Sequence, residues 1–159
     1  MYVRIQLRVE TPTHPIRRDH CIKMALIHDL AEALVGDITP PDNIPSAVKH
    51  AREREAMDYI TTELLAPMGG GIAGEFLGLW EEYEEGVTEE AVFVKDVDRF
   101  ELLVQTVEYE KRGAGKTDLA EFYHVRKGIK NVFVKEWAED VLREREEFWK
   151  GKGGGSPLP

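Results

Sequence analysis

Apolar residues recur every three or four positions along most of the chain, a pattern typical of helices that bury one face. Gly and Pro residues separate the apolar stretches and mark the expected helix ends. The predicted helices span residues 19–35, 46–66, 76–83, 88–112, 118–127 and 129–150. The expected fold class is therefore all-α, a compact bundle of about six helices.

Both ends of the chain depart from the helical pattern. Residues 1–10 alternate apolar and polar side chains with the period of a strand, so a non-helical N-terminal segment is expected. Residues 151–159 are rich in Gly and Pro, and we expect them to be disordered. Since 159 residues is the length of one ordinary domain, residues 1–150 are predicted to form a single domain.

Composition and charge exclude several classes of protein. The chain carries 30 acidic and 21 basic residues, and its net charge of −9 disfavours binding to nucleic acid. The longest apolar stretch, residues 24–35, is interrupted by charged and polar side chains, so no membrane span is predicted. The single cysteine, Cys21, cannot form an intrachain disulfide, and residues 1–10 do not resemble a secretory signal. We therefore expect a cytoplasmic protein.

One His and three carboxylates lie within ten residues of one another, in and just after the first expected helix. His28 and Asp29 are surrounded by apolar residues, so this helix is expected to be buried, and a buried carboxylate needs a cation or several donors. Glu32 follows four residues after His28, on the same helix face. Asp37 lies just past the Gly36 that ends the helix. Imidazole and carboxylates without thiolates are typical ligands of Mn²⁺, Co²⁺, Fe²⁺ or Mg²⁺.

A structural role is the alternative for this group. A lone buried His more often forms hydrogen bonds within a core than binds a metal ion. An ordinary salt bridge would need a basic partner, and the sequence has no Lys or Arg between Lys23 and Lys49. The complete set of four side chains therefore favours an external cation.

A second source of carboxylates lies in the expected helix over residues 88–112. Asp96, Asp98 and Glu101 occur there within six residues, close to Lys95 and Arg99. Charged residues along a helix are commonly solvated or paired with one another. Spacing alone therefore does not rank the three acids as ligands.

Several segments of the chain together resemble a known family. They are ALIHDLAEALVGDITPPDNIP, KHAREREAM, LWEEYE and VKDVDRFELLVQ, followed by Tyr109 and Glu110, and they cover about residues 19–123 in order. They are similar to HD-domain metal-dependent phosphohydrolases, and among these to the small 5'-deoxynucleotidases of the HD domain-containing protein 2 family.

The resemblance implies roles for individual residues. The first divalent metal ion would be held by His28, Asp29 and Asp98. Two further side chains and one backbone carbonyl would hold a second ion or act on the attacking water: Glu32, Asp37 and the carbonyl of Ile38. Glu32 is the candidate base, and Lys95 resembles the lysine that the family carries beside its distal aspartate.

The family's activity is the removal of the 5'-phosphate from deoxyribonucleoside monophosphates. The resemblance therefore predicts a phosphomonoester hydrolase that uses a divalent ion such as Mn²⁺, Co²⁺ or Mg²⁺ and acts on a small nucleotide. It also implies a homodimer, while the net charge and the absence of a long apolar run already argue against nucleic acid or a membrane as partner. Two alternatives stay open: a catalytically impaired HD-domain fragment that binds a nucleotide or a protein partner, and a hydrolase of another phosphate ester.

The N-terminal region departs from the family's pattern. Members begin with a helix that carries an Arg and a further His about thirty residues before the HD pair, and this His completes the ligands of the first ion. Counting back from His28 places that position at or before Met1. The chain is therefore expected to lack this helix and its His. His14 and His20 are the nearby imidazoles, and about 12 Å of helical rise separates His20 from His28.

Overall fold

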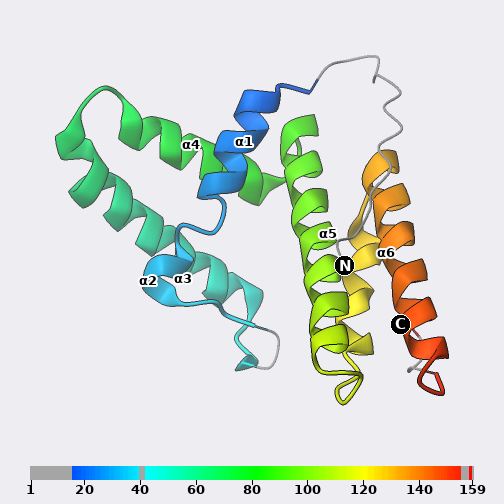
Figure 1. Cartoon of the computed structure of the whole chain (residues 1–159). Helices are drawn as coiled ribbons and strands as arrows, with labels where there is room; N and C mark the ends of the chain where they lie inside the picture. The colour runs from blue at the N-terminus through cyan, green and yellow to red at the C-terminus, as the bar shows by residue number, and fades with distance from the viewer. Residues whose placement is uncertain (1–15, 40–41, 155–157, 159) are drawn as a thin grey trace. The chain divides into compact units, whose positions relative to one another are not determined.

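The computed structural model describes residues 16–39, 42–154 and 158, and these residues contain six α-helices and no strand (Figure 1). The predicted all-α fold class is confirmed. The strand pattern of residues 1–10 lies outside the described residues. The described chain divides into two compact units, a first unit of residues 16–91 and a second unit of residues 92–154 and 158.

Helices α1 to α4 build the first unit. They span Arg18–Ile27, Glu32–Val35, Ser46–Tyr59 and Ile72–Glu85. Helix α4 packs against α1, and α2 packs against α3. The buried apolar side chains of this unit include Met24, Met57 and Trp80, which are at most 2% exposed. This packing fixes the segment between α1 and α3 that carries the predicted site.

The helix predicted over residues 19–35 is interrupted. Helix α1 ends at Ile27, and residues 28–31 form turns before α2 begins. In these turns Leu30 N–H donates to the carbonyl of Ile27 at 2.9 Å, so the bonds connect residues three apart rather than four. Gly36 ends α2 with φ of 76°, a left-handed conformation that a side chain disfavours. The predicted helix end is confirmed, and the predicted continuity is wrong.

The second predicted helix, over residues 46–66, is present with a change of geometry along its length. Helix α3 continues into a π-helical segment, Ile60–Leu65, and then a 3-10 turn, Ala66–Met68. The glycines at 69–71 all have positive φ and separate this rod from α4. Helix α4 is longer than the predicted 76–83 and ends at Gly86, whose φ is 62°.

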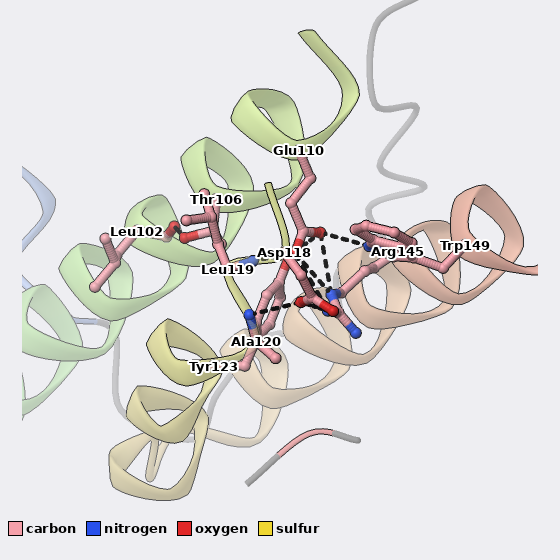
Figure 2. Close-up of polar contacts among 9 residues, drawn as sticks. All are labelled: Leu102, Thr106, Glu110, Asp118, Leu119, Ala120, Tyr123, Arg145 and Trp149. Atoms are coloured by element: carbon pink, nitrogen blue, oxygen red, sulfur yellow. Dashed lines mark hydrogen bonds and ion pairs between the residues drawn. The ribbon is translucent and has the colours of Figure 1, made fainter. Parts of the chain in front are cut away.

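Helices α5 and α6 form most of the second unit, and they run side by side in Figure 1. They span Glu89–Arg112 and Val132–Lys150, and a 3-10 segment, Ala120–Gly128, lies between them. The apolar core of this unit consists of Leu103, Val107, Tyr123, Ile129, Val134, Ala138, Val141 and Leu142. A buried polar cluster also joins α5 to α6 (Figure 2). The helices predicted over 88–112 and 129–150 are therefore present, and the one over 118–127 is a 3-10 segment.

The C-terminal tail is described in part. Residues 151–153 form a turn, and Gly154 N–H donates to the carbonyl of Trp149 at 2.9 Å. Leu158 packs against the core of the second unit. The predicted disorder of the remaining tail residues lies outside the described part of the chain. Among the helices that the structure describes, none is long and apolar enough to cross a membrane.

Candidate metal centre

His28 and Asp29 lie in the turn that follows α1. His28 Nδ1 lies 2.8 Å from the carbonyl oxygen of Ala25, and because a carbonyl only accepts, Nδ1 donates. The lone pair of the neutral ring is therefore on Nε2. His28 Nε2 lies 3.0 Å from Asp29 Oδ2, and the Tyr83 ring packs against the imidazole with 4.8 Å between centroids. The turn thus brings an imidazole nitrogen and a carboxylate oxygen together.

The geometry of this pair fits two ligands of a divalent ion. In an octahedral site with bonds of about 2.1 Å, adjacent ligand atoms lie about 3.0 Å apart. A metal-binding His typically donates its other ring N–H to a carbonyl or carboxylate, as His28 does to Ala25. The Asp29 side chain is 60% exposed. The prediction that it is buried is wrong, because the turn directs it away from the apolar face of α1.

Glu32 begins α2, and its side chain is 26% exposed. Burial raises the pKa of Glu32, and the negative charges of Asp29 and Asp37 raise it further against the opposing charge of Lys49. Glu32 does not share a continuous helix with His28, so the predicted common helix face is wrong. The raised pKa brings this carboxylate closer to the range in which a general base works near neutral pH.

Lys49 on α3 is the basic neighbour that the sequence analysis did not predict. Its Nζ donates to the carbonyl of Ile38 at 3.3 Å and lies 3.4 Å from Glu53 Oε1 and 3.9 Å from Glu32 Oε1. Burial lowers the pKa of Lys49, but the charges of Glu53 and Glu32 outweigh burial and the net direction is upward. The spacing of Lys49 and Glu53 predicts their own ion pair, whereas the contact with Glu32 requires the packing of α2 on α3.

Asp37 and Ile38 lie in the loop between α2 and α3. Asp37 is exposed and Ile38 is half-buried, with its carbonyl turned to the ammonium on α3. Asp42 stabilises the loop, since Oδ2 accepts from the Thr39 backbone N–H at 2.7 Å and from its hydroxyl at 2.9 Å. These two bonds lower the pKa of Asp42. These bonds join Asp42 to Thr39, the residue that follows Ile38.

In the second unit, Asp96 has a structural role. It is fully buried, and Oδ2 accepts from the backbone N–H groups of Lys130 and Asn131 at 2.8 and 2.6 Å. Arg99 donates to Oδ1 at 3.0 Å. Asp96 therefore holds the start of α6 against α5. Asp96 is thereby excluded as a candidate metal ligand, which leaves Asp98 and Glu101.

Asp98 and Glu101 are both exposed on α5. Glu101 accepts a hydrogen bond from Gln105, one turn further along the same helix. Asp98 is thus an accessible carboxylate in the second unit, and its role as a ligand stays a prediction. Among the residues that the structure describes, no three His, Cys, Asp or Glu side chains form a group that could hold a metal ion.

Comparison with known proteins connects this geometry to a family. The HD-domain family matches residues 6–137 of the chain. The 5'-deoxynucleotidase hdd1 of Schizosaccharomyces pombe is 46% identical over 135 residues, which cover 84% of this chain and 68% of that protein. The 5'-deoxynucleotidase HDDC2 of Xenopus laevis is 40% identical, covering 91% and 71%. The chain belongs to the HD-domain family of 5'-deoxynucleotidases.

A solved structure gives the same result for the fold of this HD domain. The HD domain-containing protein YGK1 matches with a TM-score of 0.70 and 34% identity, over 88% of this chain and 71% of that one. The chain spans 71% of the length of HDDC2 of Xenopus laevis and 51% of that of Homo sapiens. It spans 62% and 56% of two 5'-deoxynucleotidases of Saccharomyces cerevisiae. The resemblance found in the sequence is thus confirmed at the level of the family and the fold.

The two imidazoles considered as substitutes for the family's upstream His have separate outcomes. His14 lies outside the described residues of this HD domain. His20 Nε2 lies 2.7 Å from Glu82 Oε2, so this ring is engaged between α1 and α4. His20 is therefore part of the packing of the first unit rather than of the pair at His28 and Asp29.

Proposed function

We propose that this HD domain hydrolyses deoxyribonucleoside 5'-monophosphates to a deoxynucleoside and phosphate, with a divalent metal ion as cofactor. Membership of the 5'-deoxynucleotidase family supports the reaction and the nucleotide substrate. The observation that carries the site assignment is the pairing of His28 Nε2 with Asp29 Oδ2 at 3.0 Å. HD-domain phosphohydrolases use divalent metals, and Mn²⁺, Co²⁺ and Mg²⁺ suit the available nitrogen and oxygen donors.

His28, Asp29 and Asp98 would hold the first ion, and Glu32, Asp37 and the Ile38 carbonyl would bind a second ion or orient the attacking water. A bound divalent ion supplies a more acidic water and neutralises charge on the phosphoryl oxygens. Ala25 holds the His28 ring in the tautomer that leaves Nε2 available for a cation.

Glu32 would receive the proton of the attacking water. The water oxygen then forms a bond to phosphorus while the bond from phosphorus to the sugar O5' breaks, and O5' takes up a proton. The raised pKa of Glu32 supports this role because a carboxylate with an ordinary pKa is a weak base at neutral pH.

The first experiment measures phosphate release from deoxyribonucleoside and ribonucleoside 5'-monophosphates with Mn²⁺, Co²⁺ or Mg²⁺. Asp29→Asn and Asp98→Asn are expected to lower kcat/KM by about 100-fold or more, because each removes a charged ligand. Asp19→Asn and Glu101→Gln are the matched controls, since Asp19 is exposed on α1, which precedes the turn of Asp29, and Glu101 is exposed on α5 together with Asp98. Full activity in either ligand variant would contradict the assignment.

The substrate panel and the oligomeric state complete the proposal. Faster hydrolysis of the deoxy than of the ribo nucleotides is expected, and a preference for another phosphate ester would redirect the substrate assignment. A homodimer is proposed from the family resemblance, and light scattering after gel filtration tests it. Absence of phosphate release with all three ions would favour a binding module.

A further inference from the structure

Three oxygen acceptors converge on the ammonium group of Lys49 in the first unit. The Ile38 carbonyl accepts a hydrogen bond at 3.3 Å, and the carboxylates of Glu53 and Glu32 lie 3.4 and 3.9 Å away. They come from three segments: the loop after α2, α3 itself and the start of α2. An ammonium has three donors and no acceptor, so this arrangement uses Lys49 as a compact positive charge.

The acceptors around Lys49 are the kind that a divalent cation prefers. Two carboxylates and a backbone carbonyl are hard oxygen ligands, typical of Mg²⁺ and Mn²⁺ sites. Two of the groups, Glu32 and the Ile38 carbonyl, are also those proposed above to act on a second ion or on the attacking water. Lys49 therefore occupies oxygen atoms that a divalent ion would also bind.

The Lys49 ammonium can move away from these oxygen atoms, but the carboxylates it leaves behind need another positive charge. Its side chain is 34% exposed, and a flexible four-carbon stem can carry the ammonium into solvent. The Glu53 side chain is 11% exposed, and a carboxylate removed from water to that degree is destabilised without a positive partner. Exchange of one cation for another satisfies both conditions.

We propose that Lys49 is a positioning residue that holds Glu32 and the Ile38 carbonyl in place as a built-in cation, and that a divalent metal ion displaces it on binding. This inference rests on the proposed function. The ammonium keeps the oxygen ligands assembled in the metal-free protein, and it lowers the affinity for the incoming ion because the two cations compete for the same oxygens.

The test compares Lys49→Met with Lys49→Arg and with Lys23→Met as the matched control. Lys23 on α1 forms an exposed ion pair with Glu75 on α4 in the same unit. Thermal unfolding in EDTA measures how much Lys49 stabilises the metal-free protein. Calorimetric titration with Mn²⁺ measures how strongly Lys49 competes with the metal ion for the same oxygen atoms. Neither readout depends on catalysis.

Lys49→Met is expected to lower Tm in EDTA by several degrees and to bind Mn²⁺ about tenfold more tightly, since the competing charge is gone. Lys49→Arg retains a cation and is expected to stay close to the wild type in both measurements. Lys23→Met is expected to change neither. The gain in Mn²⁺ affinity is expected to vanish when Glu32→Gln is added to Lys49→Met, because the shared ligand is then lost.

Two outcomes separate this inference from the proposed function. Wild-type protein that binds Mn²⁺ and releases phosphate, with a Lys49→Met variant that binds Mn²⁺ no more tightly, overturns the displacement and leaves the function intact. Wild-type protein without saturable Mn²⁺ binding and without phosphate release overturns both. A fall in Tm accompanied by weaker Mn²⁺ binding in Lys49→Met would show a purely structural role for Lys49.

Discussion

Glu110 on α5 and Arg145 on α6 form an ion pair enclosed within the second unit (Figure 2). Arg145 Nε donates to Glu110 Oε2 at 3.1 Å and Nη2 donates to Oε1 at 3.2 Å, with the two residues 0% and 3% exposed. Glu110 also accepts from Trp149 Nε1 at 3.0 Å and from the Tyr123 hydroxyl at 3.2 Å. Each charge is thereby paired and hydrogen-bonded, which is what a buried ion pair requires.

Loss of one member of this pair should strongly destabilise the protein. Glu110→Gln removes the buried negative charge and leaves Arg145 with the partly exposed Asp118, 2.8 Å away, as its carboxylate partner, so the free energy of unfolding is expected to fall by about 2–3 kcal/mol. Glu108→Gln is the control, because Glu108 pairs with Arg112 on the exposed side of α5 and such pairs contribute about 0.5 kcal/mol. Urea unfolding measures both, and equal losses in the two variants would contradict the prediction.

Substitution of Asp96 should lower the stability of the protein, whereas substitution of Asp98 should lower its activity. Asp96→Ala removes a fully buried carboxylate that accepts from the backbone N–H groups of Lys130 and Asn131 and from Arg99, which is expected to cost about 2 kcal/mol of unfolding free energy. Asp98→Asn, at an exposed position, is expected to unfold like the wild type while losing phosphate release. A stable, inactive Asp96 variant would show that the two roles are reversed.

Acid should weaken the contact between Glu90 and Arg17. The hydrogen bond from Arg17 holds the pKa of Glu90 at about 2, below its ordinary value of 4.5. Because the folded pKa is the lower one, this stabilisation is present above about pH 4.5 and is lost as the pH falls toward 2. Glu90→Gln is therefore expected to be less stable than the wild type at pH 7, with the difference closing between pH 4.5 and 2. Urea unfolding across that range tests it, and a constant difference would contradict it.

Cys21 should react slowly in the folded protein. Burial, followed by the charge of Glu90, raises the pKa of this thiol to about 11, so little thiolate exists near neutral pH. Its reaction with a disulfide reagent at pH 8 is expected to be about 100-fold slower than that of a small thiol, and to accelerate in urea. Equal rates in folded and unfolded protein would show an accessible thiol.

The sequence predicted the helices, and it predicted their ends where a single glycine with positive φ stops the helix. Gly36 has the positive φ that ends α2 at the predicted place, and Gly86 has the positive φ that ends α4 shortly after the predicted range. The interruption at residues 28–31 was not predictable, because LIHDLAEAL has helical periodicity throughout. Its turns depend on the packing of α1 on α4 and of α2 on α3, which are contacts between distant parts of the sequence.

The sequence predicted which His and carboxylate side chains belong to the candidate site, but not which residues from other helices lie next to them. The dipeptide of His28 and Asp29 is visible in the sequence, and in the structure His28 Nε2 lies 3.0 Å from Asp29 Oδ2. Lys49 was missed because it reaches Glu32 only through tertiary packing. Asp96 and Asp98 could not be ranked because burial of Asp96 depends on a loop more than thirty residues away.

The turns at residues 28–31 also affect how the site would respond to ions of different size. In one continuous helix, the backbone would hold the side chains of His28 and Glu32 at a fixed separation. Here His28 lies in the turn after α1 and Glu32 begins α2, so non-helical residues lie between them. Such donors adjust independently to the ionic radius, and selectivity among cations depends on the rigidity of the ligand cage. This construction favours tolerance of several divalent ions over strict choice of one.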